Sequence, residues 1–118
     1  MNHASLTAFL YLAFLMIFIH LLVSSLSFLG RMVPKRIGNV VAVYEMLFYL
    51  LLIFLNFTNN IMLYIGYLYF MIHLVGGIYY IRGGLSKLKL NRGLTYYAFY
   101  ETLETLYLIF LTYFYLII

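Results

Sequence analysis

Charged side chains are scarce in this chain of 118 residues, which contains seven basic and three acidic residues. Asp, Glu, Lys and Arg together make 8% of the sequence, whereas soluble domains contain about 25%. The hydrophobic share is 67%, and the mean hydropathy is +1.05. So few charges cannot cover the surface of a soluble domain, and a disordered chain would contain far fewer apolar residues. The composition therefore excludes both classes and predicts an integral membrane protein.

Cysteine is absent altogether. Its absence excludes disulfides, thiolate metal sites, iron–sulfur clusters and cysteine nucleophiles. The sequence also has no stretch outside its apolar runs that is long enough to fold in water. We therefore expect lipids and other membrane proteins as partners, and we expect neither a domain for a soluble substrate nor a nucleic-acid partner.

Four long apolar runs follow one another along the sequence. A transmembrane helix needs about 20 apolar residues, and the runs 6–29, 37–57, 61–81 and 95–118 all reach this length. The runs are continuous and lack the period-2 alternation of strands in a membrane barrel. The sequence thus predicts an all-α fold, in which residues 1–118 form a single transmembrane domain, a four-helix bundle.

All the basic residues belong to two loops, 30–36 and 82–94. They are Arg31, Lys35, Arg36, Arg82, Lys87, Lys89 and Arg92. Because two predicted spans separate the loops, both loops lie on the same side of the membrane. The positive-inside rule makes this side cytoplasmic, or the matrix side in a mitochondrion. We therefore expect both chain termini on the outer side of a mitochondrial inner membrane or of a prokaryotic plasma membrane.

Five ionisable residues interrupt the apolar runs at similar depth. At a rise of about 1.5 Å per residue they lie roughly 13–18 Å from the basic loops, near the middle of a hydrocarbon core about 30 Å thick. They are His20, Glu45, His73, Glu101 and Glu104. Such groups are costly inside a bilayer and usually face other protein groups. Each histidine alone can be a structural hydrogen-bonding group, but two carboxylates one turn apart repel each other unless a proton, a cation or a metal lies with them.

Three kinds of chemistry fit these residues. The first is a proton relay through Glu45, Glu101, Glu104, His20 and His73, with hydroxyl groups and water as intermediates. The second is haem b, with His20 and His73 as its two axial ligands inside a four-helix bundle. The third is a metal site built from the same side chains, which we rank last because the paired Glu-x-x-His motifs of di-iron bundles are missing. We assign no catalytic residue and no metal ligand.

Residues 28–57 carry several short motifs in a fixed order. They are Phe28-Leu29-Gly30, Lys35-Arg36-Ile37-Gly38-Asn39, Glu45-Met46-Leu47 and Leu55-Asn56-Phe57. This stretch resembles subunit 4L of respiratory NADH–ubiquinone oxidoreductase, which has a basic pair and an Asn in a loop and a mid-membrane Glu in the helix that follows. The resemblance implies that Glu45 is a proton-relay carboxylate.

A shorter motif, His73-Leu74-Val75-Gly76-Gly77-Ile78, stands in the third run. It looks like the His-x-x-x-Gly-Ile haem-ligand motif in the membrane anchors of succinate dehydrogenase. This second resemblance implies that His73 is a haem b ligand.

Both resemblances imply a respiratory membrane complex. We predict a small transmembrane subunit of such an energy-converting complex, which is not catalytic by itself and contributes packing and a mid-membrane proton-relay carboxylate. Its partners would be larger subunits of the complex, lipids and a nearby quinone, and this interpretation needs no cofactor. The alternatives are a haem b electron-transfer anchor of the succinate dehydrogenase type and a small dimeric transporter.

Overall fold

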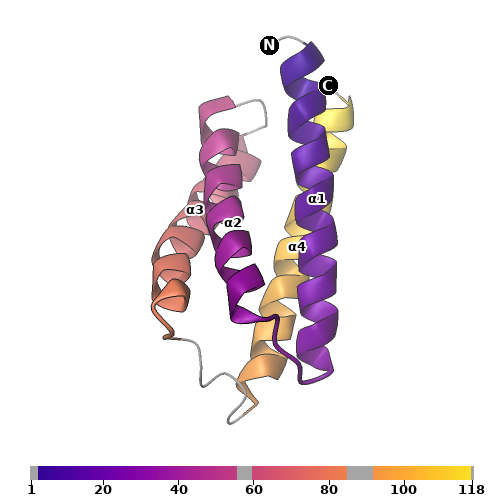
Figure 1. Cartoon of the computed structure of the whole chain (residues 1–118). Helices are drawn as coiled ribbons and strands as arrows, with labels where there is room; N and C mark the ends of the chain where they lie inside the picture. The colour runs from indigo at the N-terminus through magenta and orange to yellow at the C-terminus, as the bar shows by residue number, and fades with distance from the viewer. Residues whose placement is uncertain (1–2, 56–59, 85–91, 118) are drawn as a thin grey trace. The chain divides into compact units, whose positions relative to one another are not determined.

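Four α-helices form the regular structure of the described part of the chain (Figure 1). The computed structural model describes residues 3–55, 60–84 and 92–117. Within these ranges α1 covers His3–Phe28, α2 Lys35–Leu55, α3 Asn60–Ile81 and α4 Gly93–Ile117, and no strand is present. The predicted all-α class and the predicted number of helices are confirmed. Lys87, Lys89 and the end of the second predicted helix, at 56–57, lie outside the described residues.

Each helix begins slightly earlier than its apolar run. α1 begins at residue 3 where the apolar run predicts 6, α2 at 35 where it predicts 37, and α4 at 93 where it predicts 95. The first N–H groups of a helix have no partner within the helix, so polar and basic residues fit the first turn as well as apolar ones. Apolarity therefore marks the part of a helix that can lie in a bilayer, and the helix itself is longer.

Glycine ends both α1 and α3. Gly30 and Gly83 have positive φ angles, +74° and +85°, in the left-handed region that glycine adopts without steric cost. After α1, the N–H of Gly30 donates to the Ser27 carbonyl (3.0 Å) and the N–H of Arg31 donates to the Leu26 carbonyl (2.9 Å). This is a Schellman motif, which pairs the last carbonyls of a helix, and α3 ends with the same pattern around Gly83. The glycines at the start of both basic loops are thus helix stops.

The helices form two compact units, α1 with α4 and α2 with α3. In the α1–α4 pair, the rings of Phe9 and Tyr115 lie 4.6 Å apart between centroids, and those of Phe28 and Phe99 lie 5.2 Å apart. The contact with the higher residue number in α1 has the lower residue number in α4, so the two helices are antiparallel. His3 and Ile117 therefore lie at the same end of this pair, and Gly30 lies at the other end.

The α2–α3 pair is also antiparallel. Nζ of Lys35 lies 3.8 Å from the centroid of the Tyr80 ring, and the rings of Tyr49 and Tyr69 stack at 5.7 Å. α2 and α3 therefore form a helical hairpin. α1 and α4 are not consecutive in the chain, but they pack against each other in the same antiparallel way. The arrangement of both pairs as one bundle and one domain stays a prediction.

Polar and ionisable side chains are buried together with apolar ones, while many large apolar side chains are exposed. The buried residues of α1 include His20, Ser24 and Ser27, whereas Phe14, Phe18 and many other large apolar side chains of the helices are exposed. α1, α2 and α3 are each long and apolar enough to cross a membrane. α4 has 25 residues but contains two glutamates and several threonines and tyrosines, so it is not among the three. That α4 also crosses stays a prediction.

Gly38 in α2 lets the ring of Tyr80 in α3 lie against the helix backbone. A Cβ atom at position 38 would overlap the hydroxyl end of this ring. Lys35 also contacts Tyr80: its Nζ lies over the aromatic ring and donates a hydrogen bond to the Tyr80 carbonyl oxygen. The close approach at Gly38 therefore sets the spacing at this end of the α2–α3 pair.

We expect Gly38→Ala to lower the free energy of unfolding by about 1–3 kcal/mol, the usual cost of overpacking, because the Tyr80 ring must move. Gly76→Ala is the matched control in α3, since a Cβ atom there meets nothing within 4 Å. This control should raise stability by up to about 1 kcal/mol, because alanine favours a helix over glycine. Unfolding of the full chain in mixed detergent micelles, followed by circular dichroism, measures both values. Equal effects of the two substitutions would contradict the close approach.

Candidate functional site

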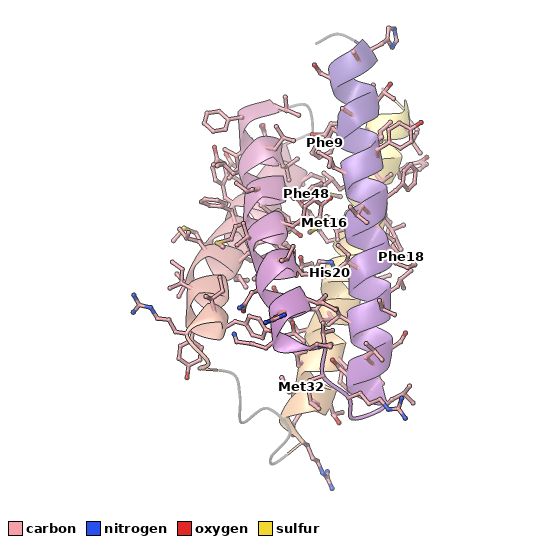
Figure 2. The ribbon with its side chains drawn as sticks, viewed as in Figure 1. Phe9, Met16, Phe18, His20, Met32 and Phe48 are labelled. Atoms are coloured by element: carbon pink, nitrogen blue, oxygen red, sulfur yellow. The ribbon has the colours of Figure 1, made fainter. Side chains whose placement is uncertain are left out.

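The central side chain of the α1–α4 pair is His20. Figure 2 shows Phe9, Met16 and His20 leaving α1 on one side and Phe18 on the other. His20 is 0% exposed. Its Nδ1 lies 2.9 Å from the Met16 carbonyl oxygen, one turn earlier in the same helix, and its Nε2 lies 2.8 Å from Oε2 of Glu104 in α4. Both ring nitrogens therefore have a partner within this helix pair.

The Met16 contact fixes the tautomer of His20. A carbonyl oxygen can only accept a hydrogen bond, so Nδ1 must carry hydrogen and donate it. In a neutral imidazole Nε2 is then an acceptor, and an ionised carboxylate has acceptors only. Two acceptors at 2.8 Å would repel each other, so the contact favours a proton on Nε2 of His20 or on Oε2 of Glu104. This close contact is therefore favourable only when one of the two atoms carries a proton.

A second carboxylate approaches the same nitrogen. Oε2 of Glu101 lies 3.4 Å from Nε2 of His20, and the Glu101 side chain is 2% exposed. One imidazolium and two ionised carboxylates would leave a net negative charge in the protein interior, which is costly without a further partner. We therefore expect the cluster of His20, Glu101 and Glu104 to hold a second proton or a cation. These side chains also provide the donor types of a metal site, the third interpretation of the sequence.

The α2–α3 pair contains a contact of the same chemistry. Nδ1 of His73 in α3 lies 2.8 Å from Oε2 of Glu45 in α2. The imidazole ring stacks on the ring of Tyr49 with centroids 5.1 Å apart and an angle of 14°, and Tyr49 stacks in turn on Tyr69. The stacked ring of Tyr49 and the carboxylate of Glu45 together fix the position of the His73 ring.

Hydroxyl groups lie beside the His20 cluster. Oγ of Ser24, one turn after His20, lies 2.8 Å from Oγ1 of Thr102 and 3.3 Å from the Ala98 carbonyl oxygen. Thr102 itself donates to the same carbonyl at 2.8 Å. Ser24 and Thr102 therefore link α1 to α4 directly next to Glu101.

The structure brings together the five ionisable residues that the sequence singles out, in two groups. His20 contacts Glu101 and Glu104, and His73 contacts Glu45. Sequence analysis missed Thr102 and the Met16 carbonyl. The sequence shows that Met16 stands four residues before His20, but it does not show that the imidazole points back toward the Met16 carbonyl. The contact of Thr102 with Ser24 depends on the register between two helices that are far apart in the chain.

No family model matches the chain, and neither the curated proteins nor the solved structures include a match to it. The resemblances to subunit 4L and to the succinate dehydrogenase anchors stay predictions.

We expect Glu104→Leu to lower the free energy of unfolding by about 1–3 kcal/mol, because it leaves the buried Nε2 of His20 without its partner. Glu104→Gln is the matched variant, since its amide can donate a hydrogen bond to Nε2, and it should cost less than about 1 kcal/mol. Unfolding in mixed micelles measures both. If the leucine variant is as stable as the glutamine variant, Glu104 is not the partner that satisfies His20.

Proposed function

We propose that this chain is a small integral membrane subunit of an energy-converting complex of a respiratory chain, and that its buried histidine–glutamate contacts hold and pass protons within the membrane. One observation carries the proposal: Nε2 of His20 lies 2.8 Å from Oε2 of Glu104, a contact that favours a proton on one of the two atoms, and both side chains are 0% exposed. A proton that is shared between two titratable groups inside apolar helices can be taken up and released without a soluble active site.

The second helix pair supports the same chemistry. His73 and Glu45 repeat the contact at the same distance, 2.8 Å, with one residue from each helix of their pair. Glu45 is also the carboxylate to which the likeness to subunit 4L assigns a relay role. Two contacts of one chemical type provide two proton-holding stations in a chain with only three acidic residues.

The distribution of the remaining side chains favours a subunit over a free-standing enzyme. Large apolar side chains are exposed on all four helices, among them Phe18, Phe54, Tyr64 and Phe110. Lipid and neighbouring membrane subunits are the surroundings that cover such surfaces. We therefore assign packing within a larger assembly as the other part of the function.

The haem b alternative fits the two histidines unequally. Iron could bind His20 only if Nε2 left Glu104, because Nδ1 is bonded to Met16. His73 contacts Glu45 through Nδ1, and metal-ligating histidines commonly donate their other ring nitrogen to a carboxylate. A haem anchor that uses His73 is thus the second candidate, and a Soret band in the oxidised and reduced spectra of the purified assembly would favour it over the proton relay.

The relay is tested in the native assembly, isolated in mild detergent with this chain in place and returned to sealed vesicles. Glu104→Gln and Glu45→Gln preserve size and hydrogen bonding but cannot take up a proton at neutral pH. Each should slow proton translocation by roughly an order of magnitude or more. Thr112→Val is the control, since its buried hydroxyl only donates to the Leu108 carbonyl in α4.

Unchanged translocation in both glutamine variants would contradict the relay. Recovery of the chain as a small species that moves a solute by itself in liposomes would contradict the subunit assignment and favour the transporter alternative.

A further inference from the structure

We infer that the cluster of His20, Glu101 and Glu104 is a binding site for one divalent transition-metal ion, which takes the place of the protons in the metal-free cluster. The site takes its nitrogen ligand from α1 and its oxygen ligands from α4, so the ion joins the two helices of this pair. The inference rests on distances, burial and charge within the pair, and it does not depend on the proton relay.

The ligand atoms have the spacing that a small metal ion requires. Nε2 of His20 lies 2.8 Å from Oε2 of Glu104 and 3.4 Å from Oε2 of Glu101. Ligand atoms that surround Zn²⁺ at about 2.0–2.2 Å are roughly 2.8–3.6 Å from one another, from right-angled to tetrahedral geometry. Both measured distances fall in this range, so each carboxylate is placed to share an ion with the imidazole.

The hydrogen bond to Met16 prepares His20 as a ligand. A histidine that binds a metal commonly donates the hydrogen of its other ring nitrogen to a carbonyl or carboxylate oxygen, which fixes the tautomer and the direction of the ring. Nδ1 of His20 makes this contact with the Met16 carbonyl oxygen at 2.9 Å. In the neutral ring the lone pair is then on Nε2, the nitrogen that lies beside both glutamates.

The charge of the cluster also favours a divalent ion. Glu101 and Glu104 are 2% and 0% exposed, so water does not screen their carboxylates. Neither α1 nor α4 contains a Lys or an Arg that could pair with them. One divalent ion with two carboxylates and a neutral imidazole has no net charge, which removes the cost of burying two like charges together. In the α2–α3 pair, His73 contacts the single carboxylate of Glu45, which balances only half of this charge.

The missing Glu-x-x-His motifs do not argue against this site. Those motifs belong to bundles that hold two metal ions. Here α4 contributes Glu101-x-x-Glu104, and the histidine comes from α1 instead. One nitrogen and two carboxylate ligands are sufficient for a single ion, with water or a further carboxylate oxygen in the remaining position. The sequence therefore argues against a di-metal centre only.

The cluster also has a purely structural alternative. Protons alone can neutralise it, and its hydrogen bonds then hold the two membrane helices together without an ion. Metal affinity distinguishes the two roles. A built site loses most of its affinity when one ligand is replaced, whereas a packing cluster binds metal weakly whichever carboxylate is present.

Zn²⁺ is the probe for the test. The full chain is refolded from denaturing detergent into mixed micelles in zinc solutions buffered by a chelator, so that the buried position of the cluster does not prevent entry of the ion. Every protein in the comparison carries His3→Gln, because the exposed His3 is an adventitious zinc ligand. Equilibrium dialysis gives the number of zinc ions per chain and their Kd, and circular dichroism shows that each variant is helical.

We expect one tightly bound zinc ion per chain. Glu101→Gln and Glu104→Gln should each raise its Kd by on the order of a hundredfold or more, since loss of an outer-shell partner alone costs about 10–100-fold. Glu45→Gln is the matched control, because it makes the same change at the other histidine–glutamate contact, and it should leave the Kd unchanged.

X-ray absorption of the zinc-loaded chain checks the ligands directly. It should show an imidazole nitrogen and carboxylate oxygens at about 2.0–2.2 Å from the metal. Three results would overturn the inference: no tightly bound zinc, the same Kd with and without the glutamine substitutions at positions 101 and 104, or a first coordination shell that lacks imidazole.

Failure of the metal site and failure of the relay are distinguishable. If zinc binds as expected while the glutamine variants of the native assembly translocate protons normally, the metal site stands and the proposed relay is wrong. If those variants lose translocation while zinc does not bind, the relay stands and the metal site is wrong.

Discussion

The 2.8 Å contact between Nε2 of His20 and Oε2 of Glu104 is the interaction on which the rest of the α1–α4 pair depends. Both side chains are fully buried in helices whose other positions are largely apolar, where an unpartnered ionisable group would be costly. Once Nδ1 is committed to the Met16 carbonyl, the contact is complete only with a proton in it. In the proposed relay, the proton that stabilises the helix pair is also the one that is exchanged.

This constraint explains the antiparallel register of α1 and α4. The ring contact of Phe9 with Tyr115 and the hydroxyl contact of Ser24 with Thr102 lie on either side of His20, and both fit the register that the histidine contact sets. A shift by one residue would turn Glu104 away from the histidine. The glycine stop at Gly30 then ends α1 shortly after Ser27, the last buried residue of this helix.

The sequence was sufficient to predict the four helices, because long apolar runs have one common outcome, and to single out the ionisable residues within them, because a charge inside such a run stands out. It was not sufficient to predict partners. His20 stands 81 residues before Glu101 and 84 before Glu104, and the choice between them depends on the rotation of each helix about its axis. Helix rotation follows from packing, which one sequence does not show.

The weaker apolarity of α4 has the same physical basis. Glu101, Glu104, Thr105 and Thr112 are all buried. The two glutamates contact His20 of α1, and the two threonines donate to carbonyl oxygens within α4. A sequence average counts these residues against membrane insertion, although their partners reduce their cost. In the α2–α3 pair, the partner of Glu45 is His73, a side chain that a sequence average also counts against membrane insertion.

The shared proton of His20 is measured most directly by ¹⁵N solid-state NMR of the full chain in bilayers, with labelled histidine and the Glu104→Gln variant for comparison. The account predicts that Nδ1 of His20 carries hydrogen in both proteins. It also predicts that the Nε2 signal shows a strong hydrogen bond or protonation, which weakens in the variant. An Nδ1 without hydrogen, or an Nε2 signal that is unchanged by the substitution, would contradict it.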